Sequence, residues 1–249
     1  MPDALIKGRK ISIVIPALNE EKLIINVLKQ FNESIKKDYD VEIIVSDGGS
    51  SDNTVNIAGK YADKVLNYNK EDSQNISRGR NEGARKSQGD VLIFLNADTR
   101  FENLKYILDE SLREIYENNV KAIACAVYVY PEEELLSDKI FHFLYNKYTS
   151  FLVSFFTGMG RGECHIIERE IFFKIGGYNE SIIAGEDFEL YMRLKKAGKL
   201  KFRNDFVIYE SPRRYRKYGY LRILWEWLKN SLSVFFFGKS VSVKWEEVR

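Results

Sequence analysis

Four side chains that carry oxygen atoms stand just after apolar segments of this chain: Glu20, Asp47, Asn96 and Asp98. Carboxylate oxygens suit hard cations such as Mg²⁺ or Mn²⁺, which proteins usually hold with one or two carboxylates while substrate phosphates supply other ligands. Each of these side chains also fits an ordinary turn or a helix N-cap, where short polar residues are preferred. They form a site only if the fold brings them together.

The apolar segments before these side chains alternate with helical patterns. Residues 11–15, 41–45 and 91–95 are typical of buried strands, and helices are expected after Glu20, from Thr54 and over 78–87. Strands that alternate with helices predict βαβ units and a parallel sheet. Ligands of such sheets bind beyond the carboxyl ends of the strands. The four side chains are therefore expected at one ligand-binding edge.

Another pair of acids lies in the second half of the chain. Residues 185–199 predict a helix whose first turn holds Glu186 and Asp187, a position where acids also compensate the helix dipole. Around it we expect a helix over 106–119, a strand over 121–131, an aromatic helical region over 138–156, and a strand with a short helix within 163–180.

Three further features have both a structural and a functional interpretation. The glycine-rich segment 158–163 lacks the strand-before, helix-after setting of a phosphate loop, and we interpret it as a flexible loop on the acceptor side. His142 and His165 stand among apolar neighbours and fit core positions better than metal ligation. The basic segment 211–222 is a solvated face, an arginine clamp for phosphate, or a contact for anionic lipid headgroups.

Composition excludes several classes of protein. The formal net charge of +2, from 38 basic and 36 acidic residues, lacks the basic excess of a nucleic-acid-binding protein. The two cysteines form no CxxC pair, which favours a reduced, cytoplasmic setting. No segment reaches the roughly 18–20 uncharged apolar residues of a spanning helix. The aromatic content of 14% is high, however, and it is concentrated after residue 140.

The order of the motifs resembles the family 2 glycosyltransferases of the GT-A fold. "SIVIPALNEE", "IIVSDGGSSDNT", "RGRNEGARKSQGDVLIFLNADT" and "GGYNE…GEDFELYMRL" occur in the order and spacing of that family, from about Lys10 to about Tyr218. "ADT" followed by "SPRRYRKYGYLR" is similar to the small bacterial and archaeal members without membrane helices. The resemblance implies a Rossmann-like, mostly parallel mixed sheet flanked by helices.

The resemblance assigns nucleotide-binding roles to five residues. Pro16, Ala17 and Glu20 match positions that line the nucleotide pocket. Asp47 matches the acid that hydrogen-bonds the base, and Arg80 matches a basic position near the nucleotide and its phosphates. The donor implied is a UDP- or GDP-sugar.

The resemblance also assigns the metal site and the catalytic base. Asn96, Ala97 and Asp98 match the DXD motif, whose last acid coordinates Mg²⁺ or Mn²⁺ on the donor diphosphate. Asn96 departs from the usual first Asp, so an amide faces the ribose and the site carries one negative charge fewer. Asp187 matches the general base of the ED motif. Arg213 and Arg214 resemble a C-terminal basic motif that would clamp phosphate.

These roles imply a glycosyltransferase that acts by a single in-line displacement. A carboxylate can remove the proton of an acceptor hydroxyl, and a cation with arginine help can neutralise the departing diphosphate. A second carboxylate beside the base, as in a retaining hydrolase, is not evident near Asp187, so inversion is expected. Two alternatives stay open: a nucleotidyltransferase, which the acidic "PALNEE" turn disfavours, and a non-catalytic nucleotide-sugar-binding or membrane-peripheral protein.

We expect a GT-A domain over 1–210, with a nucleotide-sugar half at about 10–100 and an acceptor half at about 101–210, followed by a basic and aromatic extension over 211–249. The acceptor is expected to be a hydroxyl, with lipid-linked and glycan acceptors both open. The aromatic segments 141–156 and 225–237 fit a membrane surface, a helical lid or a homodimer interface equally well. The first of these would place the protein peripherally at the inner face of the cell membrane.

Overall fold

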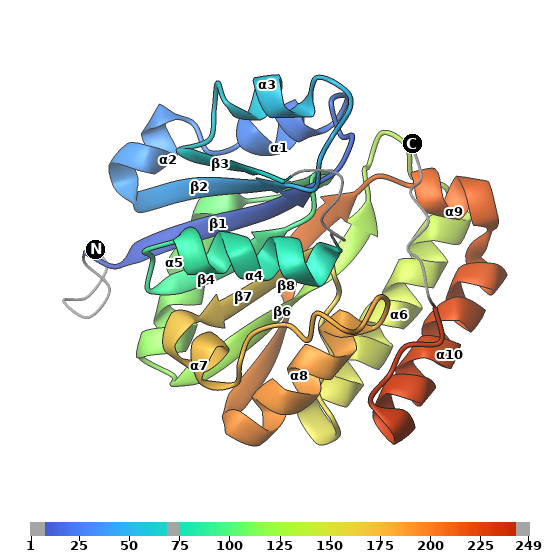
Figure 1. Cartoon of the computed structure of the whole chain (residues 1–249). Helices are drawn as coiled ribbons and strands as arrows, with labels where there is room; N and C mark the ends of the chain where they lie inside the picture. The colour runs from blue at the N-terminus through green and yellow to red at the C-terminus, as the bar shows by residue number, and fades with distance from the viewer. Residues whose placement is uncertain (1–7, 69–74, 243–249) are drawn as a thin grey trace.

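The computed structural model of the chain describes residues 8–68 and 75–242. In this part of the chain, strands form one sheet in the order β3-β2-β1-β4-β7-β6-β8-β5 (Figure 1). Their bounds are β1 Lys10–Ala17, β2 Asp40–Asp47, β3 Lys64–Asn67, β4 Val91–Leu95, β5 Thr99–Phe101, β6 Val120–Val129, β7 Cys164–Glu168 and β8 Lys199–Glu210.

Pairing is parallel in the first half of the sheet and mixed in the second. β1 pairs in parallel with β2 and β4, and β2 pairs in parallel with β3. β7 is antiparallel to both β4 and β6, β8 is parallel to β6, and β5 is antiparallel to β8. The start of β7 therefore lies at the same edge as the carboxyl ends of β1, β2 and β4.

Helices cover both faces of the sheet (Figure 1). Their bounds are α1 Ile24–Leu28, α2 Glu33–Asp38, α3 Thr54–Ala58, α4 Ile76–Lys86, α5 Leu104–Tyr116, α6 Leu136–Phe155, α7 Arg169–Lys174, α8 Glu186–Ala197, α9 Arg213–Tyr218 and α10 Tyr220–Phe237. Within the described ranges, none of these helices is long and apolar enough to cross a membrane.

The core consists of two layers because side chains alternate between the faces of each strand. Ile13 of β1 and Ile93 of β4 pack with α1, α3 and α5 on one face. Val14 and Phe94, their neighbours in sequence, pack with α4, α7 and α8 on the other. Because both faces are covered, these strands carry continuous apolar runs, as is typical of buried parallel sheets.

The structure confirms the α/β class, and the predicted strands 11–15, 41–45 and 91–95 lie within β1, β2 and β4. The helix expected after Glu20 is shorter, since Glu20 lies in a turn before α1 and Asn19 has a positive φ of 55°. The helix expected over 78–87 begins at Ile76 because the Asn75 side chain accepts a hydrogen bond from the Arg78 N–H.

Two strands, β5 and β8, were not predicted. β8 carries polar side chains along much of its length, and β5 has only three residues. The domain boundary at residue 210 falls at the end of β8, and α9 and α10 follow it. Residues 1–7 of the predicted domain and 243–249 of the predicted extension lie outside the described residues.

Candidate active site

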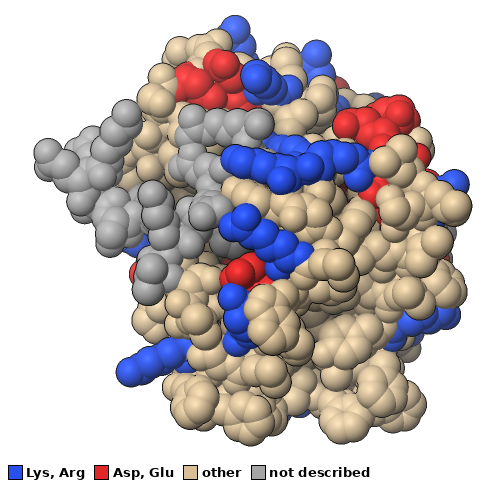
Figure 2. Space-filling view, turned by 90° about the vertical axis from the view of Figure 1, so that its right-hand side faces the viewer, with Lys and Arg blue, Asp and Glu red and all other residues tan. Residues whose placement is uncertain are grey.

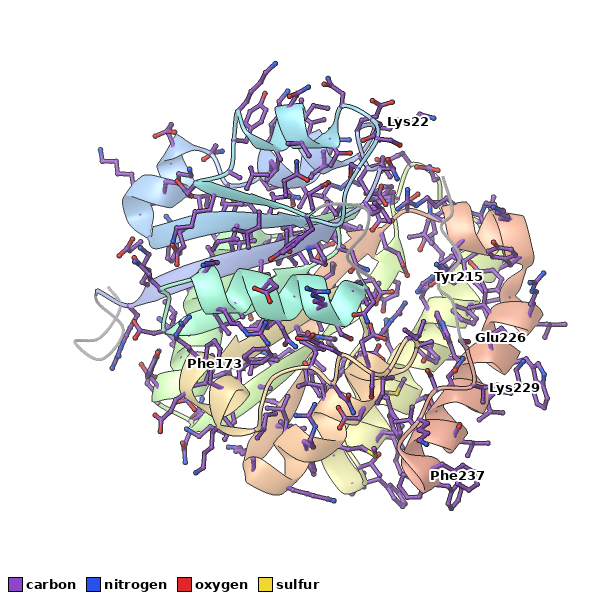
Figure 3. All side chains as sticks on the ribbon, viewed as in Figure 1. Lys22, Phe173, Tyr215, Glu226, Lys229 and Phe237 are labelled. Atoms are coloured by element: carbon purple, nitrogen blue, oxygen red, sulfur yellow. The ribbon has the colours of Figure 1, made fainter. Side chains whose placement is uncertain are left out.

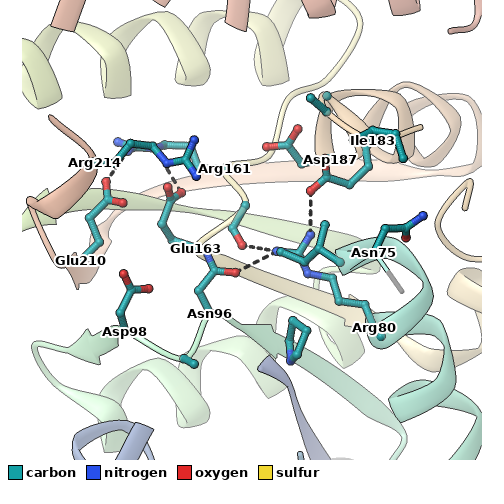
Figure 4. Close-up of a pocket in the computed structure, with 18 of the residues that line it drawn as sticks. Asn75, Arg80, Asn96, Asp98, Arg161, Glu163, Ile183, Asp187, Glu210 and Arg214 are labelled. Carbon is teal, nitrogen blue, oxygen red and sulfur yellow. Dashed lines mark hydrogen bonds and ion pairs between the residues drawn. The ribbon is translucent and has the colours of Figure 1, made fainter. Parts of the chain in front are cut away.

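A cavity of about 740 Å³ opens at the carboxyl ends of β1, β2 and β4. The end of β1 contributes Pro16 and Ala17, and the turn after it contributes Glu20. The turn after β4 contributes Asn96, Ala97 and Asp98. The first turn of α8 contributes Glu186 and Asp187 from the second half of the chain. Figure 4 shows Asp98 and Glu210 on one side of Asn96 and Arg80 on the other. The predicted convergence at one sheet edge is therefore present.

Asp98 is held in an ion-pair network with the C-terminal segment. Its carboxylate lies 3.2 Å from the Arg213 guanidinium, which also donates to Glu20 at 2.9 Å. The Asp98 side chain is 13% exposed. Burial raises its pKa to about 6, although the nearby Arg213 cation lowers it. Any further positive charge that enters the cavity would stabilise the ionised form of Asp98.

Arg80 links the two halves of the site. Its guanidinium is fully buried and donates to the Glu186 carboxylate at 3.0 Å, to the Asn96 side-chain oxygen at 3.0 Å and to the Gly162 carbonyl at 2.5 Å. Asn96 therefore uses its oxygen to accept from Arg80, which fixes the orientation of the amide. Because Glu186 already balances the charge of Arg80, an amide suffices at position 96.

Asp187 stands at the wall of the cavity with a proton affinity suited to acid–base chemistry. One carboxylate oxygen accepts from the Phe188 N–H at 2.7 Å. Burial and the negative charge of Glu186 together raise the pKa of Asp187 to about 7, against the lowering effect of this N–H and of Arg80. A base is most effective when its pKa lies near the working pH.

A third cluster, which sequence reasoning missed, lies between these two. Arg161 is buried and donates to Glu210 at 2.9 Å, and its Nε lies 3.4 Å from Glu163 (Figure 4). The Tyr215 hydroxyl donates to the same Glu210 carboxylate at 2.7 Å. Burial raises the pKa of Glu210 well above its ordinary value. Residues 158–161 are buried, so the loop 158–163 is packed into the protein, and its place on the acceptor side stays a prediction.

The structure separates the functions proposed for the basic segment. Arg213 and Arg214 line the cavity, whereas Arg216 pairs with the buried Asp138 of α6. Tyr215 is buried beneath them. A wholly solvated basic face is therefore excluded for Arg213 and Arg214. Both remain candidates for a phosphate clamp.

Asp47 differs from the other predicted residues. It is fully buried and accepts from the N–H groups of Gly49 and Ser50 at 2.9 and 2.8 Å and from the Ser50 hydroxyl. Its neighbours Ser46 and Gly48 line the cavity, and Asp47 itself stands behind them. In this state its carboxylate shapes the turn that carries Gly48, and a direct contact with a nucleotide base stays a prediction.

The two histidines occupy the core, as predicted. His142 lies beside Arg161 at 3.1 Å, and burial next to that cation lowers its pKa to about 2. His165 lies 2.5 Å from the Tyr178 hydroxyl, and burial lowers its pKa well below the ordinary value. Both rings are neutral at physiological pH, and neither lines the cavity.

The side chains at the sheet edge fit a hard divalent cation only together with a ligand. In the described ranges, no three His, Cys, Asp or Glu side chains are grouped as a protein-only metal site. Asp98 offers a carboxylate at the cavity wall, with Glu20 on the other side of Arg213. Mg²⁺ and Mn²⁺ sites that handle phosphates commonly have one or two carboxylates and take the remaining oxygens from the phosphates. Asp98 fits that pattern.

Among the known proteins to which this chain is similar, three are informative. The 4,4'-diaponeurosporenoate glycosyltransferase of Staphylococcus haemolyticus is 32% identical over 134 residues, which are 51% of this chain and 35% of that protein. The mannosyltransferase of Pyrobaculum calidifontis, solved with GDP-Man and Mn²⁺, has a TM-score of 0.60 at 18% identity. The structural alignment covers 82% of this chain and 56% of that chain. This chain therefore spans about a third of the first relative's length.

The third is glucosyl-3-phosphoglycerate synthase from Mycobacterium tuberculosis, solved with Mn²⁺, UDP and glucosyl-3-phosphoglycerate. It has a TM-score of 0.60 at 18% identity, and the structural alignment covers 92% of this chain and 79% of that chain. These likenesses establish the GT-A fold. The family model for glycosyl transferase family 2 matches residues 12–176. This chain therefore belongs to glycosyl transferase family 2.

Proposed function

We propose that this protein transfers a sugar from a UDP- or GDP-sugar to a hydroxyl acceptor, with inversion at the anomeric carbon. The observation that carries the proposal is that Asp98 and Asp187, from opposite halves of the chain, line one cavity at the carboxyl edge of the sheet. One carboxylate suits a diphosphate-bound cation, and the other suits proton removal. The acceptor class stays open between a lipid-linked hydroxyl and a glycan.

The donor nucleotide lies, in this proposal, against the turns after β1 and β2. Pro16, Ala17 and Gly48 offer a small, close wall for a base and ribose, and Asn96 and Ala97 continue it. Asp98 would hold Mg²⁺ or Mn²⁺ together with the diphosphate, and such a cation would supply positive charge against the negative charge of the leaving group. Arg213 and Arg214 contribute positive charge beside the same phosphates.

Asp187 acts as the general base. Its carboxylate removes the proton of the acceptor hydroxyl as the acceptor oxygen bonds to the anomeric carbon and the bond from that carbon to the diphosphate breaks. Because its pKa is raised to about 7, the ionised form is a stronger base than an ordinary aspartate yet is still populated near neutral pH. Arg80 holds Glu186 at 3.0 Å and so keeps that second acid engaged beside the base.

Inversion requires that no second carboxylate attacks the sugar. The structure corrects the expectation that none lies nearby, because Glu163 lines the same cavity and its negative charge raises the pKa of Asp187. Glu163 is paired with Arg161, however, which favours a structural part for it rather than nucleophilic attack. Anomeric analysis of the product distinguishes the two outcomes, and retention would overturn the inverting mechanism.

The function is tested by measuring nucleotide release from a panel of UDP- and GDP-sugars, with and without Mn²⁺. Asp187→Asn should keep donor affinity and lose turnover by roughly 10²–10⁴, the usual effect of losing a general base. Glu189→Gln is the matched control, because Glu189 lies in the same helical turn, pairs with Arg193 and does not line the cavity. Full turnover in Asp187→Asn would remove Asp187 from the mechanism.

The donor site is tested separately by calorimetry of UDP or GDP binding. Asp98→Ala should abolish the dependence of nucleotide affinity on Mn²⁺, since the remaining ligands would be phosphate and water oxygens. If Asp98→Ala bound the nucleotide with unchanged Mn²⁺ dependence, the turn after β4 would have no part in metal binding.

A further inference from the structure

Exposed apolar side chains are concentrated on one part of the molecule. Among the described residues, twenty large apolar side chains are exposed; nine of them lie in 135–156 and nine in 221–241. The other two are Tyr106 and Phe173. Monomeric soluble proteins rarely expose large contiguous apolar patches unless these bind something.

The two helices concerned expose apolar side chains on the side opposite to the one that packs on the protein. On α10, Ile223, Asn230 and Val234 are buried against the protein, whereas Trp225 and Leu232 on the other side are 60% and 48% exposed. α6 repeats the pattern, with His142 and Val153 buried and Phe143, Phe151 and Phe155 exposed. A surface helix normally turns its apolar side to the core and a polar side to water. The apolar outer side of each of these helices therefore indicates an apolar environment.

α6 and α10 lie side by side and run in the same direction (Figure 1). Phe141 contacts Tyr220 near the start of both helices, with ring centroids 4.2 Å apart, and Tyr145 contacts Trp227 further along, at 5.1 Å. Their carboxyl ends therefore lie at the same end of the molecule (Figure 1). In Figure 3, Phe237 lies at this end and points away from the body of the protein.

Charge is distributed along this face in layers. The last charged residue before the end of α6 is Lys147, and none occurs over 148–156. The last on α10 is Lys229, and none occurs over 230–238. At 1.5 Å per residue, Phe155 and Phe237 each lie about 12 Å beyond the preceding lysine. Figure 2 shows the lower part of this side almost free of charged side chains, with Lys and Arg above and beside it.

This layering matches a membrane interface. An interfacial segment buries its apolar part about 5–10 Å into the boundary of headgroups and acyl chains, while lysine and arginine stay at headgroup level. The Lys147 ammonium already lies 5.6 Å from the Phe143 ring centroid, so its chain runs along apolar surface. The exposed acid of α10, Glu226, pairs with Lys229, and Asp138 of α6 is buried and paired with Arg216.

A second copy of the chain fits this surface less well. Interfaces between proteins are depleted of lysine and are centred on well-packed anchors that enter pockets of the partner. Here the two most exposed phenylalanines, Phe155 at 75% and Phe237 at 77%, stand at the extremity of the face rather than at its centre. The lysines lie within it. Charge and shape both favour a lipid surface.

We infer that the outer side of α6 and α10 docks on an anionic lipid bilayer, with the phenylalanine-rich ends inserted and Lys147 and Lys229 at the headgroups. The inner side of α10 lines the cavity through Trp227, Asn230 and Ser231. Docking therefore brings the cavity close to the bilayer. If the protein has the proposed function, a cavity this close to the bilayer takes its acceptor from the membrane. The acceptor class is then a hydroxyl-bearing membrane lipid.

The test is flotation of the full chain with extruded vesicles of phosphatidylcholine, alone or with about a third phosphatidylglycerol. Wild type should float with the anionic vesicles. Phe237→Ser should weaken partitioning by about tenfold, the effect of leaving one phenylalanine side chain without an apolar environment. Phe173→Ser is the matched control, because Phe173 is also exposed but lies in α7 on another side of the molecule (Figure 3).

The charged layer has its own variant. Lys147→Gln combined with Lys229→Gln should reduce the preference for anionic vesicles by about tenfold or more and leave weak binding to neutral vesicles unchanged. The inference is overturned if wild type stays unbound to both vesicle types or if Phe173→Ser weakens binding as much as Phe237→Ser. It is also overturned if sedimentation shows a stable dimer that Phe237→Ser dissociates.

Failure of this inference is distinguishable from failure of the proposed function. Phe237→Ser should bind UDP or GDP with Mn²⁺ as wild type does, because Phe237 does not line the cavity. Asp98→Ala should float as wild type does while losing the Mn²⁺ dependence of nucleotide binding. Loss of flotation in Asp98→Ala would mean that the two surfaces are not independent, which contradicts docking through the outer sides of α6 and α10.

Discussion

The raised pKa of Asp187 predicts that this residue destabilises the folded protein as pH rises. Its ordinary pKa is 3.8 and its folded pKa is about 7, so the folded state holds a proton that the unfolded state releases. The two states are equally protonated below about pH 4. Between about pH 4 and pH 7 the unfolded state is favoured progressively, and above that the cost is constant.

The size of the effect follows from the same two values. At 1.36 kcal/mol for each tenfold change in proton affinity, the full difference is about 4 kcal/mol, and somewhat more than half of it falls between pH 5 and pH 8. Asp187 is only partly buried, and solvent screens its charge. We therefore expect about 1–2 kcal/mol between these two pH values.

The assay is urea unfolding of wild type, Asp187→Asn and Glu189→Gln at pH 5 and pH 8. The free energy of unfolding of Asp187→Asn minus that of wild type should be about 1–2 kcal/mol larger at pH 8 than at pH 5. Other buried carboxyls such as Asp98 also titrate, but they are present in both proteins and cancel in the difference. Glu189→Gln controls for loss of an acid from the first turn of α8. An equal difference between Asp187→Asn and wild type at both pH values would refute the reasoning.

Three further variants test other parts of the site and fold. Asn96→Asp adds a negative charge beside Asp98 and should tighten Mn²⁺ binding in the presence of UDP by about tenfold, as measured by calorimetry; unchanged affinity would separate residue 96 from the metal. Arg213→Gln removes a cation that competes for Asp98 and Glu20, so Mn²⁺ alone should bind more tightly while UDP binds more weakly, and a change of both affinities in one direction would contradict this. Gly160→Ala places a methyl group 2.1 Å from the buried Tyr191 ring and should cost about 3 kcal/mol in urea unfolding, whereas Gly59→Ala, with nothing nearer than 3.4 Å, should not.

The donor side of the site was predictable because it depends on local sequence patterns. Each of β1, β2 and β4 is a short apolar run followed at once by a turn, so its carboxyl end can be located from the sequence. Parallel pairing then places those ends at one edge. Asp98 and Glu20 were found in this way, and both line the cavity.

The middle of the site was not predictable in the same way. Glu163 and Glu210 flank β7 and β8, whose positions in the sheet depend on pairing between distant segments. Glu163 did carry a signal: it directly precedes an apolar strand, and an antiparallel strand begins where its parallel neighbours end. The contact between Arg213 and Glu20 joins residues 193 positions apart, and no local pattern predicts such a pair.

Burial, together with the negative charges of neighbouring acids, raises the pKa values of three carboxyl groups of the cavity, those of Asp98, Asp187 and Glu210. Seven acidic side chains and four arginines line the wall. A nucleotide diphosphate adds further negative charge, so it binds there only if positive charge enters with it or protons do. Asp98, with its pKa already raised to about 6, lies beside the two arginines of the C-terminal segment. A divalent cation at Asp98 would offset both the diphosphate and the surplus of acids, and would lower the pKa of Asp98. The excess of carboxylates is thus a reason, separate from the DXD motif, to expect that donor binding requires a metal ion. This reason applies even though residue 96 is an asparagine.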